Sequence, residues 1–217
     1  MAGFEIGNRP IDATPKARML GGTVMNVFRL LAGLMSGVIV GTPAYGQAPD
    51  PRAGDAVELF RAFCLSTGGT PDRALAILGE GNALAKRLPD DIVRQAQGNR
   101  EGGIGWAVRS PNDAEIMLDY DNRGICGVRI READEASVQA AFAAIARDLA
   151  MKTSEDDAGE FSSRTPEVRD VDGVRITYTA HSFPLGNRQA ILALTTAEET
   201  VGEQQHFMTF AFVEQAD

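Results

Sequence analysis

Two histidines, His181 and His206, are the side chains of this sequence best suited to act as a general base near neutral pH. A hydrolase pairs such a base with a nucleophile and with a third group that orients the base. Ser182 adjoins His181, but neighbouring residues of a strand point to opposite faces, so these two side chains cannot pair directly. The chain also lacks the Gly-x-Ser-x-Gly segment that presents a serine nucleophile in many hydrolases. A hydrolase that uses His181 or His206 is therefore the alternative function, and we assign no catalytic residue from the sequence.

The two cysteines, Cys64 and Cys126, are predicted to bond to each other. Cys64 shares the apolar stripe of a predicted helix with Phe60, and Cys126 alternates with Val128 on the inward face of a predicted strand. Both thiols therefore point toward one core, and an even number of cysteines in an oxidising compartment favours pairing. Closing so long a loop stabilises a fold by about 4 kcal/mol. The alternatives are two inert buried thiols or a thiol hydrolase based on Cys64, whose nucleophile the disulfide would remove.

Two segments are similar to ligand-binding loops, but neither predicts a metal or a cofactor. Residues 119–124 begin like a calcium loop, yet Arg123 occupies the third ligand position and Ile130 the place of the bidentate glutamate. This segment is predicted to be a hairpin turn. Residues 79–81 begin like a dinucleotide fingerprint, but Leu84 replaces the third glycine and a helix rather than a strand is expected before them.

The N-terminal segment is predicted to be a cleaved secretory signal peptide over 1–46. An uncharged apolar run, Leu30–Val40, follows Arg29, and small residues stand two apart at Ala44 and Gly46. A basic flank, a short apolar core and a small-x-small site are typical of export signals. As a helix the run covers roughly half of a bilayer core, so it cannot remain as a stable anchor.

The mature protein is expected to begin near Gln47, with a short leader over 47–53 and a single domain over 54–217. Met25 is a possible true start, since the stretch before it is long for a signal peptide. The location expected is the periplasm, or the medium if the protein is secreted. The formal charge of −9 repels phosphates and anionic lipids, so nucleic acid and membranes are not expected partners.

Apolar residues recur at helical spacing in the first part of the domain and at every second position further on. Helical spacing predicts helices over 55–66, 70–78 and 82–88, with one or two more turns over 89–96. Alternation predicts strands over 104–108, 116–120, 126–130, 168–171, 174–180, 189–196 and 206–213, with a helix over 134–151 and a polar loop over 152–164. Because strands and helices do not alternate, the sequence predicts an α+β fold: N-terminal helices, then a mostly antiparallel sheet of about seven strands with one helix packed on it.

The sheet is expected to turn one face to the core and the other to solvent. Asp172-Gly173 predicts a tight hairpin turn. After this turn Val174, Ile176 and Tyr178 are expected to face the core, and the residues expected in solvent are Arg175, Thr177 and Thr179. Trp106 alternates with apolar neighbours and is expected in the core rather than in a ligand site.

Phe60, Phe63 and Cys64 on the first helix, Trp106 on a strand, and the Gly-x-Cys-x-Val segment around Cys126 form a combined pattern. This pattern resembles small uncharacterised exported (periplasmic) proteins of proteobacteria, a family of unknown function, over most of residues 55–213. The resemblance implies no activity and supplies no catalytic residue. The function expected is an exported, non-enzymatic module of the cell envelope that binds a small molecule or an envelope protein on one sheet face.

Overall fold

The computed structural model describes residues 48–79, 81–155, 160–201 and 204–213, all within the compact unit Gly46–Asp217. The predicted signal peptide over 1–46, its cleavage site and Met25 lie outside the described residues. Among the helices of these ranges, none is long and apolar enough to cross a membrane.

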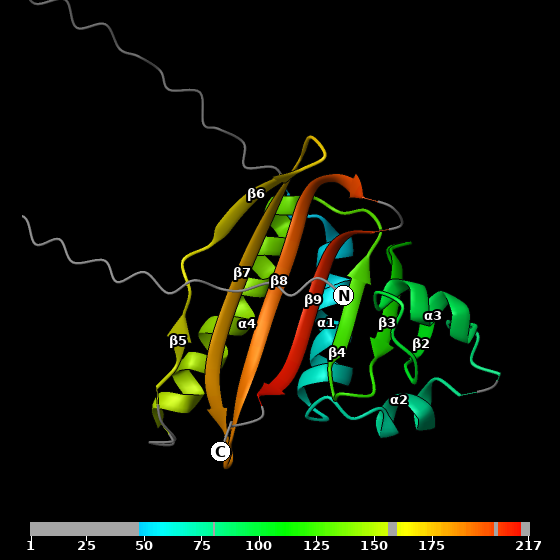
Figure 1. The fold of residues 1–217 in the computed structure, drawn as a ribbon, viewed down its shortest axis with the longest axis horizontal. Coiled ribbons are helices and arrows are strands. Elements are labelled where there is room, and N and C mark those ends of the chain that lie inside the picture. The colour runs from blue at the N-terminus through cyan, green and yellow to red at the C-terminus, as the bar shows by residue number, and fades with distance from the viewer. Residues whose placement is uncertain (1–47, 80, 156–159, 202–203, 214–217) are drawn as a thin grey trace, which may run out of the picture. The chain divides into compact units, whose positions relative to one another are not determined.

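The described strands form one antiparallel sheet with the order β1-β2-β3-β4-β9-β8-β7-β5, and β6 also pairs with β7 (Figure 1). Their bounds are β1 (Ala85–Arg87), β2 (Ile104–Arg109), β3 (Glu115–Tyr120), β4 (Cys126–Ile130), β5 (Ser162–Ser163), β6 (Glu167–Val171), β7 (Val174–Leu185), β8 (Arg188–Val201) and β9 (Gln204–Val213). The predicted α+β class and antiparallel sheet are confirmed. Two short strands, β1 and β5, raise the expected seven to nine within the described residues.

Strand β1 replaces the helix predicted over 82–88. The carbonyl oxygen of the Asn82 side chain accepts hydrogen bonds from the backbone N–H of Leu84 at 2.8 Å and of Ala85 at 3.1 Å. This local turn sets the chain into an extended path, and β1 then pairs with Trp106–Val108. Pairing with a neighbouring strand outweighs the high helix propensity of the residues involved.

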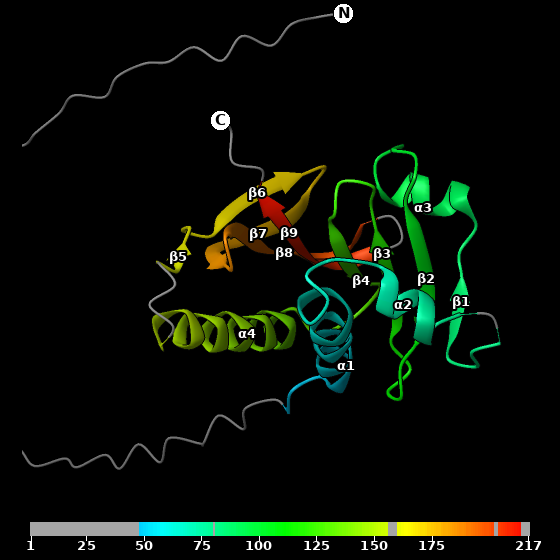
Figure 2. The same cartoon turned by 90° about the horizontal axis from the view of Figure 1, so that it is seen from below.

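Helices cover both faces of the sheet (Figure 2). The helical segments are α1 (Pro51–Phe60), the π-helical turn η1 (Arg61–Leu65), α2 (Asp72–Ile77), α3 (Asp90–Ala96) and α4 (Glu135–Glu155). They confirm the predicted helices over 55–66, 70–78, 89–96 and 134–151, with shifted ends. Helices α1 and α4 lie on one face, where the sequence predicted one packed helix, because each carries a buried apolar stripe that includes Phe60 on α1 and Phe142 on α4. Helix α3 lies on the opposite face.

The predicted disulfide between Cys64 and Cys126 is confirmed, with Cα atoms 5.4 Å apart. It joins η1 to β4, so the first helical segment crosses the sheet at Cys126 as expected. Both cysteines are fully buried, and Trp106 lies in the same core. The Tyr120 hydroxyl donates to the backbone carbonyl of Phe63 at 2.8 Å, which fixes this segment to β3 as well.

Val174 is less exposed than Arg175, as predicted for β7, but the predicted face is wrong by one residue over 177–179. Thr179 pairs with Leu194, which belongs to the buried row on the α4 side, and Thr177 and Thr179 line a groove against α4. Tyr178 points the other way and is 38% exposed. The apolar residues of β7 lie near the sheet edge, where β6 rather than a helix packs beside them, so hydrophobicity does not decide which of its faces is buried. The turn at Asp172-Gly173 forms as predicted, with positive φ at both residues.

Candidate functional site

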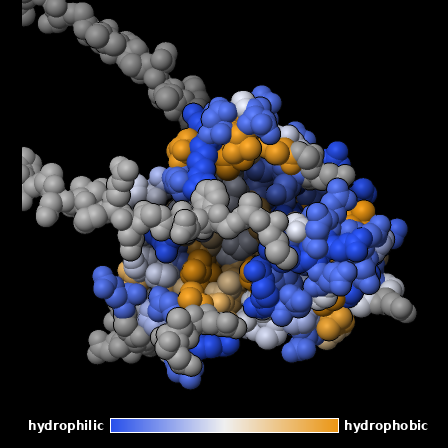
Figure 3. Space-filling model, viewed as in Figure 1, coloured by the Kyte–Doolittle hydropathy of each residue, from blue (hydrophilic) through white to orange (hydrophobic). Residues whose placement is uncertain are grey.

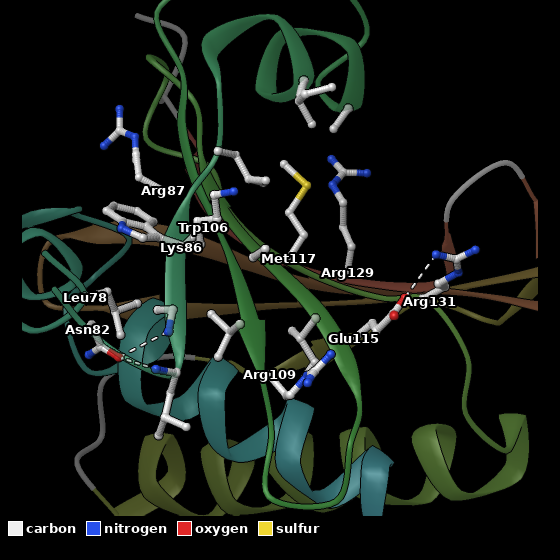
Figure 4. Close-up of a pocket in the computed structure, with 18 of the residues that line it drawn as sticks. Leu78, Asn82, Lys86, Arg87, Trp106, Arg109, Glu115, Met117, Arg129 and Arg131 are labelled. Carbon is white, nitrogen blue, oxygen red and sulfur yellow. Dashed lines mark hydrogen bonds and ion pairs between the residues drawn. The ribbon is translucent and has the colours of Figure 1, made fainter. Parts of the chain in front are cut away.

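A groove of about 1300 Å³ surrounds the end of the sheet at β1 (Figure 4). We call it the edge groove. It is lined by β1, the residues just before β1, α3, β2 and β3, with contributions from Arg129, Arg131 and Gln204. On the sheet face seen in Figure 3, hydrophilic residues gather on the α3 side. Five of the described residues that line the edge groove are cationic, and Glu115 is the acidic one.

The strand register brings these cations together. Lys86 pairs with Ala107, Ala107 with Met117, and Met117 with Arg129, so the four form one row across β1 to β4. Arg109 pairs with Glu115 one step along the same face. Helix α3 forms the wall over this row and contributes Ile92 to the groove. Residues far apart in the sequence therefore become one charged surface.

Two of the cations are neutralised by neighbouring groups. The Arg129 guanidinium donates to Asp119 at 3.1 Å and to Gln204 at 2.7 Å, and it lies over the Phe207 ring at 3.7 Å. Arg131 forms an ion pair with Glu115 at 3.0 Å, visible in Figure 4. These contacts position both arginines and reduce their capacity to attract a ligand.

The other three cations of the edge groove, Lys86, Arg87 and Arg109, form no ion pair with any described residue. All three are exposed. The Arg87 guanidinium lies 5.1 Å from the centre of the Trp106 ring, an arrangement that holds the cation in place while leaving it charged (Figure 4). Such a set of unpaired cations around a groove can bind an anionic group.

Apolar side chains lie beside the charges. Leu75, Leu84 and Ile92 line the edge groove and are among the exposed large hydrophobic residues of the molecule, with Leu84 64% exposed. Apolar surface with a few placed charges is the usual composition of a binding site. The groove can therefore hold a ligand that carries both apolar and anionic groups.

His206 is in no position to act on a ligand. It is 1% exposed, one ring nitrogen lies 3.0 Å from the Ala133 carbonyl oxygen, and Nδ1 has no partner among the described residues. Burial lowers the pKa of its imidazole, so the neutral form is favoured. His206 is a core residue of β9.

His181 lies in a second groove, of about 440 Å³, between α4 and β7. We call it the His181 groove. The Nδ1 atom of His181 lies 2.8 Å from the Ser163 hydroxyl oxygen, and the His181 ring packs against the rings of Phe142 and Phe161. Burial lowers the pKa of His181. Among the described residues no carboxylate forms a hydrogen bond with this ring, so the pair lacks the orienting group of a catalytic triad.

The remaining sequence candidates have structural roles. Asp119 is buried against Arg129 and the Gln97 amide, and Asp121 accepts from the backbone N–H groups of its own turn. The predicted hairpin turn is thus confirmed, and the described residues contain no group of three or more side chains suited to a metal. The glycines at 79 and 81 lie between α2 and β1, ahead of a strand, which is not the geometry of a dinucleotide site. Cys64 is disulfide-bonded and supplies no nucleophile.

Comparison of this chain with protein-family models, curated proteins and solved structures gives no match. The sequence reasoning missed both grooves. Lys86 and Arg109 come together only through the β1–β2 register, and Ser163 reaches His181 only because β5 pairs with β7. Neither residue pair has a characteristic spacing that a sequence motif could reveal.

Proposed function

We propose that this chain is an exported, non-enzymatic binding module of the cell envelope that holds an anionic partner in the edge groove. The observation that carries the proposal is the set of unpaired cations, Lys86, Arg87 and Arg109, in a chain whose net charge is −9. In so acidic a molecule a local cluster of cations is a distinctive surface. A cluster of unpaired cations can attract at close range an anion that the net charge repels.

Export is supported by two independent features. The signal-peptide pattern over 1–46 directs a chain out of the cytoplasm. A fully buried disulfide between Cys64 and Cys126 is typical of proteins that fold in an oxidising compartment such as the periplasm. A partner in that compartment is an envelope protein, peptide or small molecule rather than nucleic acid.

The test uses the exported protein and fluorescein-labelled poly-L-glutamate as the probe, with fluorescence anisotropy as the measurement. The wild type should bind, and binding should weaken as salt rises. The double variant Lys86→Glu/Arg109→Glu should bind about tenfold more weakly, because each exposed attraction is worth up to about 1 kcal/mol. Arg147→Glu/Arg164→Glu is the matched control, since both are exposed cations outside the edge groove with no ion pair to a described residue. An equal loss in this control would mean that only net charge matters, and the proposal would fail.

A hydrolase is the second candidate, and the 2.8 Å contact between Ser163 and His181 favours it. In that reaction the Ser163 oxygen would attack an ester carbonyl and its proton would pass to His181, which would then protonate the leaving alkoxide. Water would hydrolyse the acyl-serine in the second half. A fluorophosphonate probe reacts with such activated serines. Labelling that is lost in Ser163→Ala and retained in Ser162→Ala would establish the hydrolase, whereas the binding-module proposal expects no labelling of either serine.

A further inference from the structure

Strand β1 ends the sheet, and its hydrogen bonds show which of its backbone groups are free. The Leu88 N–H donates to the Gly105 carbonyl at 2.9 Å, and the Arg109 N–H donates to the Leu84 carbonyl at 3.0 Å. In an antiparallel pair, alternate residues direct their backbone groups to the same neighbour. Positions 84, 86 and 88 therefore bond to β2, and positions 85 and 87 direct their backbone groups away from the sheet.

The outward groups at these two positions are not equivalent. The Ala85 N–H donates to the Asn82 side chain at 3.1 Å. The Ala85 carbonyl and both backbone groups of Arg87 face outward, and within the described residues no strand pairs with β1 on that side. Figure 2 shows β1 at the outer side of β2, at the end of the sheet. An extended chain laid along β1 would meet one donor and two acceptors.

The side chains around this edge suit a strand of alternating character. Arg87 shares a sheet face with Trp106, and Lys86 shares the opposite face with Ala107 and Met117. Exposed apolar residues continue both faces: Leu84 and Ile92 lie on the Lys86 side, and Leu75 of α2 lines the groove on the Arg87 side. Successive side chains of an added strand point to opposite faces, so each face would present both a cation and apolar surface to the incoming chain.

We propose that the partner is an extended acidic peptide segment that adds to β1 as a further strand of the sheet. This inference rests on the proposed function and names the ligand of the same groove. The peptide supplies the backbone groups that Arg87 and Ala85 lack, and its carboxylates, on one face of the added strand, meet the unpaired Lys86 and Arg109. A second copy of this chain is a poor occupant, because pairing two β1 edges would bring the lysine and arginine of one copy against those of the other.

The experiment compares binding of blocked peptides to the exported protein. The parent probe is acetyl-Glu-Val-Glu-Val-Glu-Val-amide, and the charge control replaces each Glu by Lys. Three derivatives carry backbone N-methyl groups. The first is methylated at every backbone nitrogen, the second at the Glu nitrogens only, and the third at the Val nitrogens only. Because only alternate residues face β1, the fully methylated peptide should bind about tenfold or more weakly than the parent, and at least one alternating derivative should keep its affinity.

A second measurement reads the protein side of the same contact. Amide hydrogen exchange of the labelled protein should slow at the Arg87 N–H when the parent peptide is added, and the Lys86 N–H, which already bonds to β2, should serve as the unchanged control. Equal binding by the parent and the fully methylated peptide, or loss of binding by both alternating derivatives, would overturn strand addition. If poly-L-glutamate bound and no Glu-Val peptide did, strand addition would fail while anion binding stood.

A third measurement tests whether β1 pairs instead with a second copy of this chain. If sedimentation showed a dimer without peptide, and dimer formation alone protected the Arg87 N–H, the edge would belong to a second copy and the proposal would be overturned. A monomer at all concentrations, with Arg87 protection only in the presence of the Glu-Val peptide, is the expected result.

Discussion

The two ends of the sheet differ in how completely they are closed. At the β7 end, β6 pairs with Val174–Tyr178 and β5 pairs with His181 and Ser182, so short strands cover most of the length of β7. At the other end, β1 covers only Trp106–Val108 of β2, and a groove surrounds it. At the β7 end, two further strands pair with most of the last long strand. At the other end, the last strand has three residues and borders the edge groove.

The two ends of the sheet also differ in whether their cationic side chains form ion pairs. At the β7 end, Arg169 pairs with Glu167 at 2.6 Å and Arg175 pairs with Glu198, and Arg164 is a single exposed cation with no ion pair to a described residue. At the β1 end, Lys86 and Arg87 have no ionic partner among the described residues. Strand β6 also has a free edge, but within the described residues it is β1 that combines a free edge with a groove and several unpaired cations. This coincidence is the reason to place a partner at β1 rather than at β7.

The largest effect is expected from breaking the disulfide that fixes η1 to the β1 half of the sheet. Cys64→Ser should lower the free energy of unfolding by about 4 kcal/mol, because the unfolded chain loses its long closed loop. Urea unfolding measures this change. Hydrogen exchange should then accelerate more in β2–β4 than in β7, since the lost bond is to β4. Two titratable thiols in unfolded, unreduced wild-type protein would contradict the pairing itself.

The second effect concerns the buried ion pair between Asp119 and Arg129, the arginine of which lines the edge groove. Asp119→Asn should destabilise the fold by about 3 kcal/mol, because the side chains of Asp119 and Arg129 are only 5% and 11% exposed and the arginine would lose its counter-charge. The same change frees a cation, so poly-L-glutamate should bind more tightly. Urea unfolding and anisotropy are the two measurements.

Glu115→Gln is the matched control for that substitution. Its ion pair with Arg131 lies on the same half of the sheet, but both side chains are about 60% exposed. Removing an exposed pair should cost less than about 1 kcal/mol. Equal destabilisation by the two variants would show that burial of the Asp119–Arg129 pair carries no special weight.

The sequence predicted well wherever a local pattern and the tertiary environment agree. Strict alternation over 104–108, 116–120 and 126–130 identified β2, β3 and β4, and two cysteines on apolar faces gave the disulfide. The helix predicted over 82–88 is wrong, because pairing with β2 places good helix formers such as Ala85 and Lys86 in a strand. The face expected for Tyr178 is wrong because α4 covers the opposite face of β7, the face of Thr177 and Thr179.

The candidate site could not be predicted for a related reason. Each member of the edge groove is an ordinary surface residue in sequence, and only the register of three strands places Lys86, Arg109 and Arg129 on one face. The contact of His181 with Ser163 depends on a two-residue strand inside a segment predicted to be a loop. Local periodicity carries no information about which strands become neighbours.

The smallest effect is expected at Asp50, which links the helices beneath the two halves of the sheet. Its carboxylate accepts from the Arg52 side chain and backbone at the start of α1 and from the Asp134 backbone just before α4. The bond from Arg52, which outweighs the opposing effect of burial, lowers the pKa of Asp50 from 3.8 to about 2. Asp50→Asn keeps an acceptor but removes the charge, so it should cost about 1 kcal/mol at neutral pH.

The pH dependence of that loss identifies its cause. Because the pKa of Asp50 is lower in the folded protein than in the unfolded chain, its charge stabilises the fold above pH 3.8, and this contribution fades as the pH falls toward 2. The urea midpoints of wild type and Asp50→Asn should therefore differ at pH 6 and converge near pH 2. Asp72→Asn, an exposed change in the first turn of α2, should match the wild type throughout. A constant gap between wild type and Asp50→Asn across this range would mean that packing, and not the charge joining α1 to α4, accounts for the loss.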